Sequence, residues 1–251
     1  MSLAPNARAI GRSLHTYYAP GRAEALDAFL GRFVTAEDLA FDIGAHVGDR
    51  TASLRRIGAR VVAVEPQPRL ARLLRRLFGR DEGVTLVPAL IGSQQGQGRL
   101  HLNSANPTVA TASEAFMAAA ETAPGWEGQV WDGAIAVPVT TLDALAGEHG
   151  MPTFIKLDIE GFEAAALAGL SKPVRSLSFE FTTLQRQVAL DALGALEDLG
   201  DYSFNACIGE EMRFVLEGPV HAGTMARWLE VLPDSANSGD IYASLEEARV
   251  T

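Results

Sequence analysis

Short apolar runs alternate with amphipathic segments along most of this chain. Three such runs, at residues 39–43, 60–65 and 153–158, each carry an acid at or near their end. Continuous apolar runs of this length are typical of strands that are buried on both faces, as in a parallel sheet. The alternation of strands and helices predicts an α/β fold with a doubly wound, mostly parallel sheet and helices on both faces.

The clearest helix is expected at about residues 70–78, where apolar side chains recur every three or four positions and arginines fill the opposite face. A further helix begins at Thr140, whose spacing from Asp143 fits a capping box. Other helices are expected at residues 22–33, 49–57, 113–122, 161–170 and 185–199. Other strands are expected at residues 84–87, 100–102, 135–139, 176–181, 202–208, 212–216 and 240–245.

The pattern divides the chain into two parts. Residues 1–37 are interpreted as an N-terminal lead-in with one helix, and residues 38–251 as the main domain. That domain is interrupted at about residues 103–133 by an irregular insertion rich in small and polar residues. A long insertion within a compact domain is commonly functional or mobile, so we expect it to contribute to a binding site.

Composition and charge narrow the function classes. The formal net charge of −10 repels polyanions, so no nucleic-acid partner is expected, and the arginines at residues 69–80 are interpreted as a solvated helix face. No apolar run is long enough to span a membrane, and residues 1–9 lack the apolar core of a secretory signal. Cys207 is the only cysteine, which excludes an intrachain disulfide. We expect a cytoplasmic protein with no membrane partner; the sequence does not specify an oligomeric state.

A glycine turn follows the first apolar run. Gly44 and Gly48 lie between a predicted strand and a predicted helix, and such glycines allow a tight turn and the close approach of a ligand. Their spacing lacks the middle glycine of the dinucleotide fingerprint Gly-x-Gly-x-x-Gly. A pyrophosphate needs an open helix N-terminus, whereas adenosylmethionine has no phosphate and tolerates a looser turn. The turn alone is equally compatible with a structural role.

Two acidic strand ends follow. Glu65 ends the second run, where an acid can accept hydrogen bonds from both ribose hydroxyls of an adenosyl group; the alternative is an exposed carboxylate before Pro66. The segment from Lys156 to Glu163 places four ionisable groups at the end of a buried strand, which is costly unless they find partners. Such strand ends line the ligand crevice of open α/β sheets, although an ion-pair network serving only the fold is the alternative.

The order of these segments resembles the FkbM family of methyltransferases. The segments that carry the resemblance are Phe41-Asp42-Ile43-Gly44-Ala45-His46-Val47-Gly48, Val64-Glu65-Pro66, Val139-Thr140-Thr141-Leu142-Asp143 and Phe154-Ile155-Lys156-Leu157-Asp158-Ile159-Glu160-Gly161-Phe162-Glu163. The resemblance implies a Rossmann-like class I methyltransferase fold and S-adenosylmethionine as the methyl donor. It further implies O-methylation of a hydroxyl on a sugar or small natural product, so a small-molecule or glycan acceptor is the expected partner.

The resemblance also implies donor-binding roles. Residues expected to bind the methionine part, the ribose, the adenine and the reacting end of the donor are, in chain order, Asp42, Gly44, Ala45, His46, Gly48, Glu65, Pro66, Ala89, Leu90 and Asp158. Three features depart from the family pattern. His46 stands where an Asn is frequent, an Asn common after the second helix is absent around Leu77-Phe78, and Ser93 stands where an acid is frequent, so the resemblance implies no specific contact to the adenine amino group.

Methyl transfer to a hydroxyl requires an in-line acceptor oxygen and a group that removes its proton. Asp158, Glu160 and Glu180 are the candidate bases, and Lys156 is the candidate that orients a carboxylate or stabilises an oxyanion. His46 ranks below these acids because it belongs to the donor loop.

Several alternatives stay open at this stage. Asp158, Glu160, Glu163 and Glu180 offer hard oxygen ligands for magnesium, but carboxylate clusters are more often ion-paired, and no metal is expected. Trp126 and Trp131 are equally suited to a sugar-stacking lid or to anchoring the insertion. The competing functions are a non-catalytic methyltransferase-like partner protein and, with less support, a nicotinamide-dependent oxidoreductase.

Overall fold

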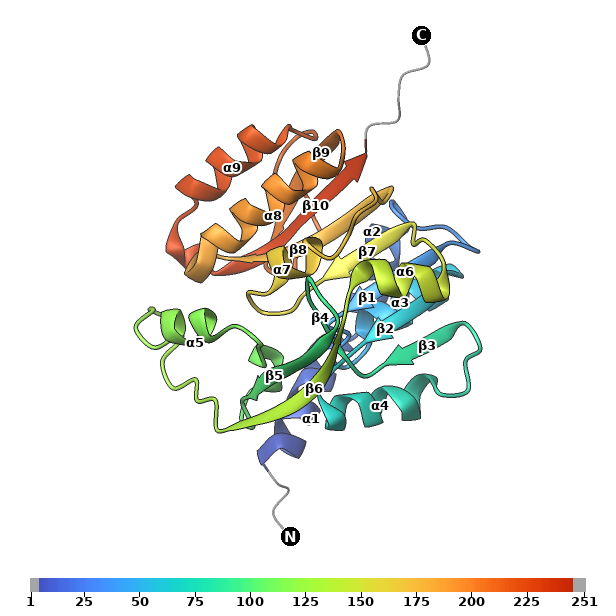
Figure 1. Ribbon diagram of the computed structural model, residues 1–251, viewed down its shortest axis with the longest axis vertical. Coiled ribbons are helices and arrows are strands. Elements are labelled where there is room, and N and C mark those ends of the chain that lie inside the picture. Colours follow the sequence, from blue (N-terminus) through green and yellow to red (C-terminus); the bar gives the residue numbers. More distant parts are fainter. Residues whose placement is uncertain (1–4, 246–251) are drawn as a thin grey trace.

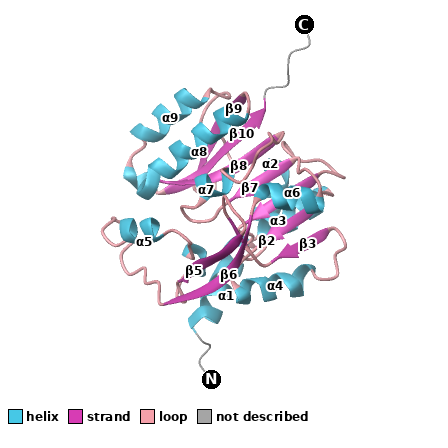
Figure 2. Ribbon diagram, viewed as in Figure 1, coloured by secondary structure: helices cyan, strands magenta, loops and turns pink. Residues whose placement is uncertain are grey.

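A seven-stranded sheet forms the centre of the molecule, as the computed structural model of residues 5–245 shows (Figures 1 and 2). Its strands, in spatial order, are β3 (Val84–Val87), β2 (Arg60–Val64), β1 (Leu39–Ile43), β7 (Phe154–Leu157), β8 (Ser176–Thr182), β10 (Ser238–Leu245) and β9 (Tyr202–Ile208). The first five are mutually parallel, and β10 runs antiparallel to both of its neighbours. The doubly wound, mostly parallel sheet expected from the sequence is confirmed.

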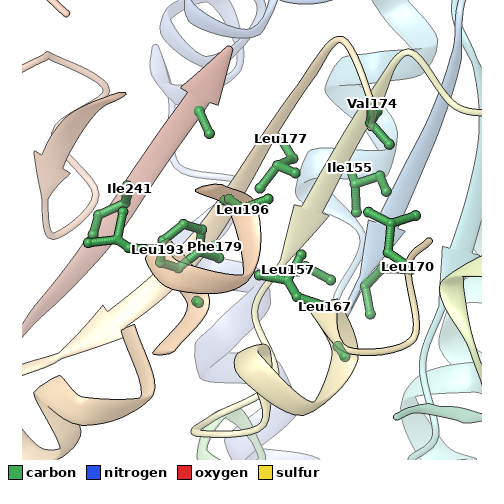
Figure 3. Close-up of a cluster of buried hydrophobic side chains, with 14 of the residues drawn as sticks. Ile155, Leu157, Leu167, Leu170, Val174, Leu177, Phe179, Leu193, Leu196 and Ile241 are labelled. Atoms are coloured by element: carbon green, nitrogen blue, oxygen red, sulfur yellow. The ribbon is translucent and has the colours of Figure 1, made fainter. Parts of the chain in front are cut away.

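Helices cover both faces of this sheet. One face is covered by α6 (Leu142–His149), α7 (Glu163–Leu167), α8 (Arg186–Leu199) and α9 (Ala222–Val231). The other is covered by α2 (Arg22–Leu30), α3 (Asp49–Ile57) and α4 (Pro68–Phe78). Figure 3 shows the first layer, where Phe179 and Leu177 of β8 pack against Leu193 and Leu196 of α8. No helix within residues 5–245 is long and apolar enough to cross a membrane.

The strands read as unbroken apolar runs because both of their faces are covered. Along β1 every residue is buried, and successive side chains alternate between the two layers: Phe41 and Ile43 join the layer of α6–α9, whereas Ala40 joins the layer of α2–α4. Full burial of each large apolar side chain contributes about 1.5–3 kcal/mol.

A second, smaller sheet lies beside the carboxyl ends of the central strands (Figure 1). It consists of β4 (Leu90–Ile91), β6 (Gly133–Thr140) and β5 (Gly96–Leu102), and the insertion between β5 and β6 contains the 3-10 turn η1 (Pro107–Val109) and α5 (Glu114–Ala120). Trp126 and Trp131 both meet the ring of Phe116 edge-on, and the Trp131 indole donates a hydrogen bond to the Val109 carbonyl. The two tryptophans therefore anchor the insertion.

Four expectations about individual elements are corrected. The lead-in contains a further helix, α1 (Pro5–Tyr17), which was missed because its buried positions hold small residues, Ala9 and Ser13. Residues 212–216 do not form a strand of either sheet. The cap of α6 is Thr141, whose hydroxyl accepts from the N–H of Ala144, whereas Thr140 ends β6. Of the helix expected at residues 161–170, only α7 forms. The chain first turns through left-handed backbone at residues 160 and 161, so the helix cannot begin there.

The remaining short turns are η2 (Thr183–Gln185), before α8, and η3 (Asp234–Ala236), before β10. The division at residues 37/38 stays a prediction, and its ends, residues 1–4 and 246–251, lie outside the described residues. Within the described part, α2 packs on α3 and shares the buried layer of the central sheet.

Candidate active site

A cleft opens at the carboxyl ends of β1, β2 and β7. It encloses about 670 Å³ of space that is open to solvent. The chain leaves β1 towards β2 on one side and later returns to β7 on the other, so this is the point at which the strand order reverses. Ligands of open α/β sheets bind at such switch points.

The glycine turn forms the floor of this cleft. Gly44 has a φ of 80°, and a Cβ there would collide with the carbonyl oxygen of Asp158, so only glycine allows the turns after β1 and β7 to approach so closely. The N–H groups of Gly44 and Ala45 both donate to the carbonyl of Val64, at 3.0 Å each. The turn is thus tied to the end of β2 by its own backbone.

Glu65 lies at the end of β2, beside the turn. Its two carboxylate oxygens accept hydrogen bonds from the N–H of His46 (3.0 Å) and of Gln67 (2.8 Å). Burial raises the pKa of Glu65 to about 8, although the two N–H donors oppose the shift. Each oxygen retains acceptor capacity on the side that lines the cleft, which is what a pair of ribose hydroxyls requires.

His46 contributes a neutral ring to the same wall. Its backbone lies in the left-handed region, with φ 49°, and its ring meets the ring of Tyr17 edge-on at 5.6 Å. Burial lowers the pKa of His46 to about 4, against the opposing effect of Asp158, so the imidazole is uncharged near pH 7. Its Nε2 is buried without a hydrogen-bond partner among the described residues, which leaves a polar atom for a ligand to satisfy.

An ion pair lies opposite Glu65. The ammonium of Lys156 donates to Asp158 Oδ2 at 2.5 Å. Burial alone would favour the neutral amine, but Asp158 and Asp42 outweigh it and raise the pKa of Lys156. Lys156 is 5% exposed, whereas the Asp158 side chain is 32% exposed, so the pair presents its carboxylate to the cleft.

Glu160 and Glu180 lie next to this pair. One carboxylate oxygen of each lies within 4.8 Å of the others and of one from Asp158. Burial, together with neighbouring acids, raises the pKa values of Glu160 and Glu180 well above the ordinary range. Glu163 does not join them: its carboxylate accepts hydrogen bonds from the N–H groups of Ile159 and Gly161.

Most of the residues predicted from the sequence meet at this cleft. Those that line it are Gly44, Ala45, His46, Glu65, Pro66, Leu90, Lys156, Asp158 and Glu160. The structure places them together, while their individual roles stay predictions.

Four predicted residues do not line the cleft. Asp42 is fully buried and accepts a hydrogen bond from the Thr51 hydroxyl, so the expected convergence of three acids on the cleft is met by Glu65 and Asp158 only. Gly48 packs against α4, because a Cβ there would overlap the side chains of that helix. Ala89 is buried beside the cleft, and Glu180 lies behind Glu160.

A network of charged residues along another wall was missed. Arg50 is 8% exposed and contacts Asp49 (2.9 Å) and Glu210 (2.7 Å), and Glu210 also binds Arg22 (2.6 Å). The two arginines lower the pKa of Glu210 to about 2, against the effect of its burial. Asp49 and Arg50 directly follow the glycine turn, which is a usable signal, but Glu210 and Tyr17 belong to segments without any motif.

The comparisons with known proteins agree with this geometry. The family model described as the methyltransferase FkbM domain matches residues 42–205. No curated protein sequence matches the chain. Among solved structures, a TehB-like SAM-dependent methyltransferase from Corynebacterium glutamicum is similar at 12% identity and a TM-score of 0.49, with 94% of this chain and 96% of that chain covered. Precorrin-6y C5,15-methyltransferase from Geobacter metallireducens GS-15 has 17% identity, a TM-score of 0.45, and coverages of 90% and 87%. At these values neither likeness adds to the family match.

Proposed function

The chain belongs to the FkbM-domain family of methyltransferases, and on that premise we propose that it transfers a methyl group from S-adenosylmethionine to a hydroxyl of a sugar or small natural product. The observation that carries the proposal is the single cleft that Glu65, the Lys156–Asp158 pair and the glycine turn line together. Supporting it, the cleft has the two chemically different ends that an adenosyl group joined to an amino acid requires.

The chain's own residues fit the donor. Glu65 would accept hydrogen bonds from the ribose hydroxyls, with Pro66 and Leu90 as apolar neighbours of the adenine. The ammonium of the donor's amino-acid end would pair with a carboxylate of the wall, and Asp158, whose side chain is 32% exposed, is the candidate. The unpartnered Nε2 of His46 supplies a further hydrogen-bonding atom on the same side.

The turn argues against a nicotinamide cofactor. A pyrophosphate is bound by free backbone N–H groups at the start of a helix. Here the N–H groups of Gly44 and Ala45 are engaged by Val64, and that of His46 is engaged by Glu65. An open cleft that retains these acids likewise argues against a non-catalytic relative.

The donor, when bound, supplies an electrophilic methyl group, so the chain has to position an acceptor oxygen and take its proton. Asp158 and Glu160 line the cleft, and a carboxylate there can accept the acceptor's proton. Lys156 holds Asp158 in place. The low pKa of His46 makes it a weak base, in keeping with its lower rank.

The acceptor is expected to contact α1 and the insertion. Tyr17 of α1 and Pro107 and Thr108 of η1 line the cleft, and Arg12 of α1 donates a hydrogen bond to the Ala105 carbonyl at 2.6 Å. These segments close the side of the cleft opposite the sheet. Their mixed hydroxyl and apolar lining suits a hydroxylated small molecule.

Titration calorimetry separates the candidates. We expect saturable, one-site binding of S-adenosylmethionine and S-adenosylhomocysteine and no binding of NAD. Incubation with a panel of hydroxylated sugars and natural products, followed by mass spectrometry, should then show a product heavier by one methylene. Binding of NAD in preference to the adenosyl donor would overturn the assignment.

A further inference from the structure

Three carboxylates meet at the inner end of the cleft, where β7 and β8 lie side by side. Asp158 follows β7, Glu180 belongs to β8, and Glu160 sits in the turn between β7 and α7. One oxygen from each lies within 4.8 Å of the other two. Hard divalent cations bind oxygen ligands at about 2.1–2.6 Å, which places the ligand oxygens within about 5 Å of one another.

Two of these carboxylates are without a partner among residues 5–245. No hydrogen bond or ion pair from any residue between 5 and 245 reaches the carboxylate of Glu160 or of Glu180. Glu160 is nonetheless 94% buried, as its exposure of 6% shows, and its side chain lines the cleft. Oε2 of Glu180 is buried and unsatisfied. An unpaired buried carboxylate costs several kcal/mol, and a second one beside it costs more.

Three other acids in or near the cleft are satisfied. Glu65 accepts two backbone N–H groups, Glu163 accepts two more, and Glu210 binds two arginines. Glu160 and Glu180 have no such partners among the described residues; the deeper Asp42 also has one buried oxygen without a partner there, but its other oxygen accepts from the Thr51 hydroxyl. When Asp158, Glu160 and Glu180 are all ionised, the single ammonium of Lys156 leaves two of their negative charges uncompensated.

We propose that Asp158, Glu160 and Glu180 bind one divalent cation of the magnesium class. The ligand set is all oxygen, which suits magnesium or manganese and not zinc or copper. This replaces the expectation, drawn from the sequence, that ion pairs alone would neutralise these acids. Cation binding does not depend on the proposed function; its use does, because a cation there would orient an acceptor hydroxyl at the cleft and favour loss of its proton.

The test uses manganese as the probe and the full chain without any donor. Titration of Mn²⁺ followed by electron paramagnetic resonance reports free metal directly. We expect one bound Mn²⁺ per chain, displaced by excess Mg²⁺, and at least tenfold weaker binding in Glu160→Gln and in Glu180→Gln. Glu114→Gln is the matched control, because it removes the same charge from an exposed side chain outside the cluster and should bind as the unmodified chain does.

Thermal unfolding checks that the Gln variants remain folded. Without metal, both Gln variants should melt at the same temperature as the unmodified chain or higher, because repulsion between the carboxylates is relieved. Added Mn²⁺ should raise the melting temperatures of the unmodified chain and of Glu114→Gln only. No binding by the unmodified chain at millimolar Mn²⁺, or full binding by both cluster variants, would overturn the site. Neither outcome bears on donor binding, which is measured separately.

Discussion

The two faces of the central sheet differ in what their strands present. Towards α6–α9 the strands present apolar residues such as Ile155, Leu177 and Phe179 (Figure 3). Towards α2 and α3 the sheet presents both aromatic and charged residues: Phe154 of β7 and Tyr242 of β10 stack on Phe33, and Lys156 follows Phe154 along β7 on the same face.

The charged end of this second face is continuous across the sheet. Asp42, Lys156 and Ser178 are in register on β1, β7 and β8, and Glu180 and Asp240 are paired one step nearer the cleft. Burial of such groups opposes folding unless they are paired. The comparison teaches that one face supplies stability, while the other gives up part of its apolar area to hold charges at the cleft.

The largest expected effect comes from the apolar face. Phe179→Ala should lower the free energy of unfolding by about 3–5 kcal/mol, because it leaves a cavity between β8 and the helices. Urea unfolding measures the change. Leu77→Ala removes an apolar side chain that is 48% exposed and should cost less than about 0.5 kcal/mol. Equal costs for the two variants would refute the stabilising role of this face.

On the charged face, function should suffer more than stability. Asp158→Asn should reduce methyl transfer at least about a hundredfold, since it removes a carboxylate at the reacting end and a candidate base. Product formation is measured by mass spectrometry with the acceptor found by screening, and Asp191→Asn on the exposed side of α8 serves as the control. Turnover within twofold of the unmodified chain would remove Asp158 from the chemistry.

Glu65 should affect donor binding alone. Glu65→Ala is expected to weaken the binding of S-adenosylmethionine at least tenfold, or about 1.4 kcal/mol, through the loss of the ribose contacts. Calorimetry gives the affinity, and the exposed Glu82→Ala provides the comparison. If the affinity is unchanged, the ribose contact is made elsewhere.

The smallest effect concerns pH. Because burial raises the pKa of Glu65 to about 8, its carboxyl group is mostly protonated at pH 7 and ionises as the pH rises through 8. The ionised form accepts both ribose hydroxyls, so donor affinity should increase severalfold between pH 7 and 9 and then level off. The difference between the unmodified chain and Glu65→Gln isolates this contribution from the titration of the donor itself. Identical pH profiles for the two proteins would contradict it.

Local patterns predicted the fold well where burial is continuous. The strands that contain Asp42 or lead into Glu65 and Asp158 were predictable because both faces of a parallel sheet are covered, so their residues are mostly apolar. Helix α1 was not, because its most buried positions hold the small residues Ala9 and Ser13.

The candidate site was predictable only as far as its motifs reach. Strand ends and glycines identified most of the cleft, but Arg50 finds its partner Glu210 at a distance of 160 residues in the sequence, which no local pattern encodes. Four acids were considered together as oxygen ligands, and the structure separates them. Glu163 is satisfied by backbone N–H groups, whereas Asp158, Glu160 and Glu180 lie together. Only the geometry of the turn after β7 decides which of the four acids stay available as ligands.

A crystal structure of the chain with S-adenosylhomocysteine tests the central claim most directly. The account predicts that the ribose hydroxyls lie within hydrogen-bond distance of the Glu65 carboxylate and that the amino-acid end of the ligand lies beside Asp158, above the glycine turn. An adenosyl group bound elsewhere, or in this cleft without contact to either acid, would contradict it.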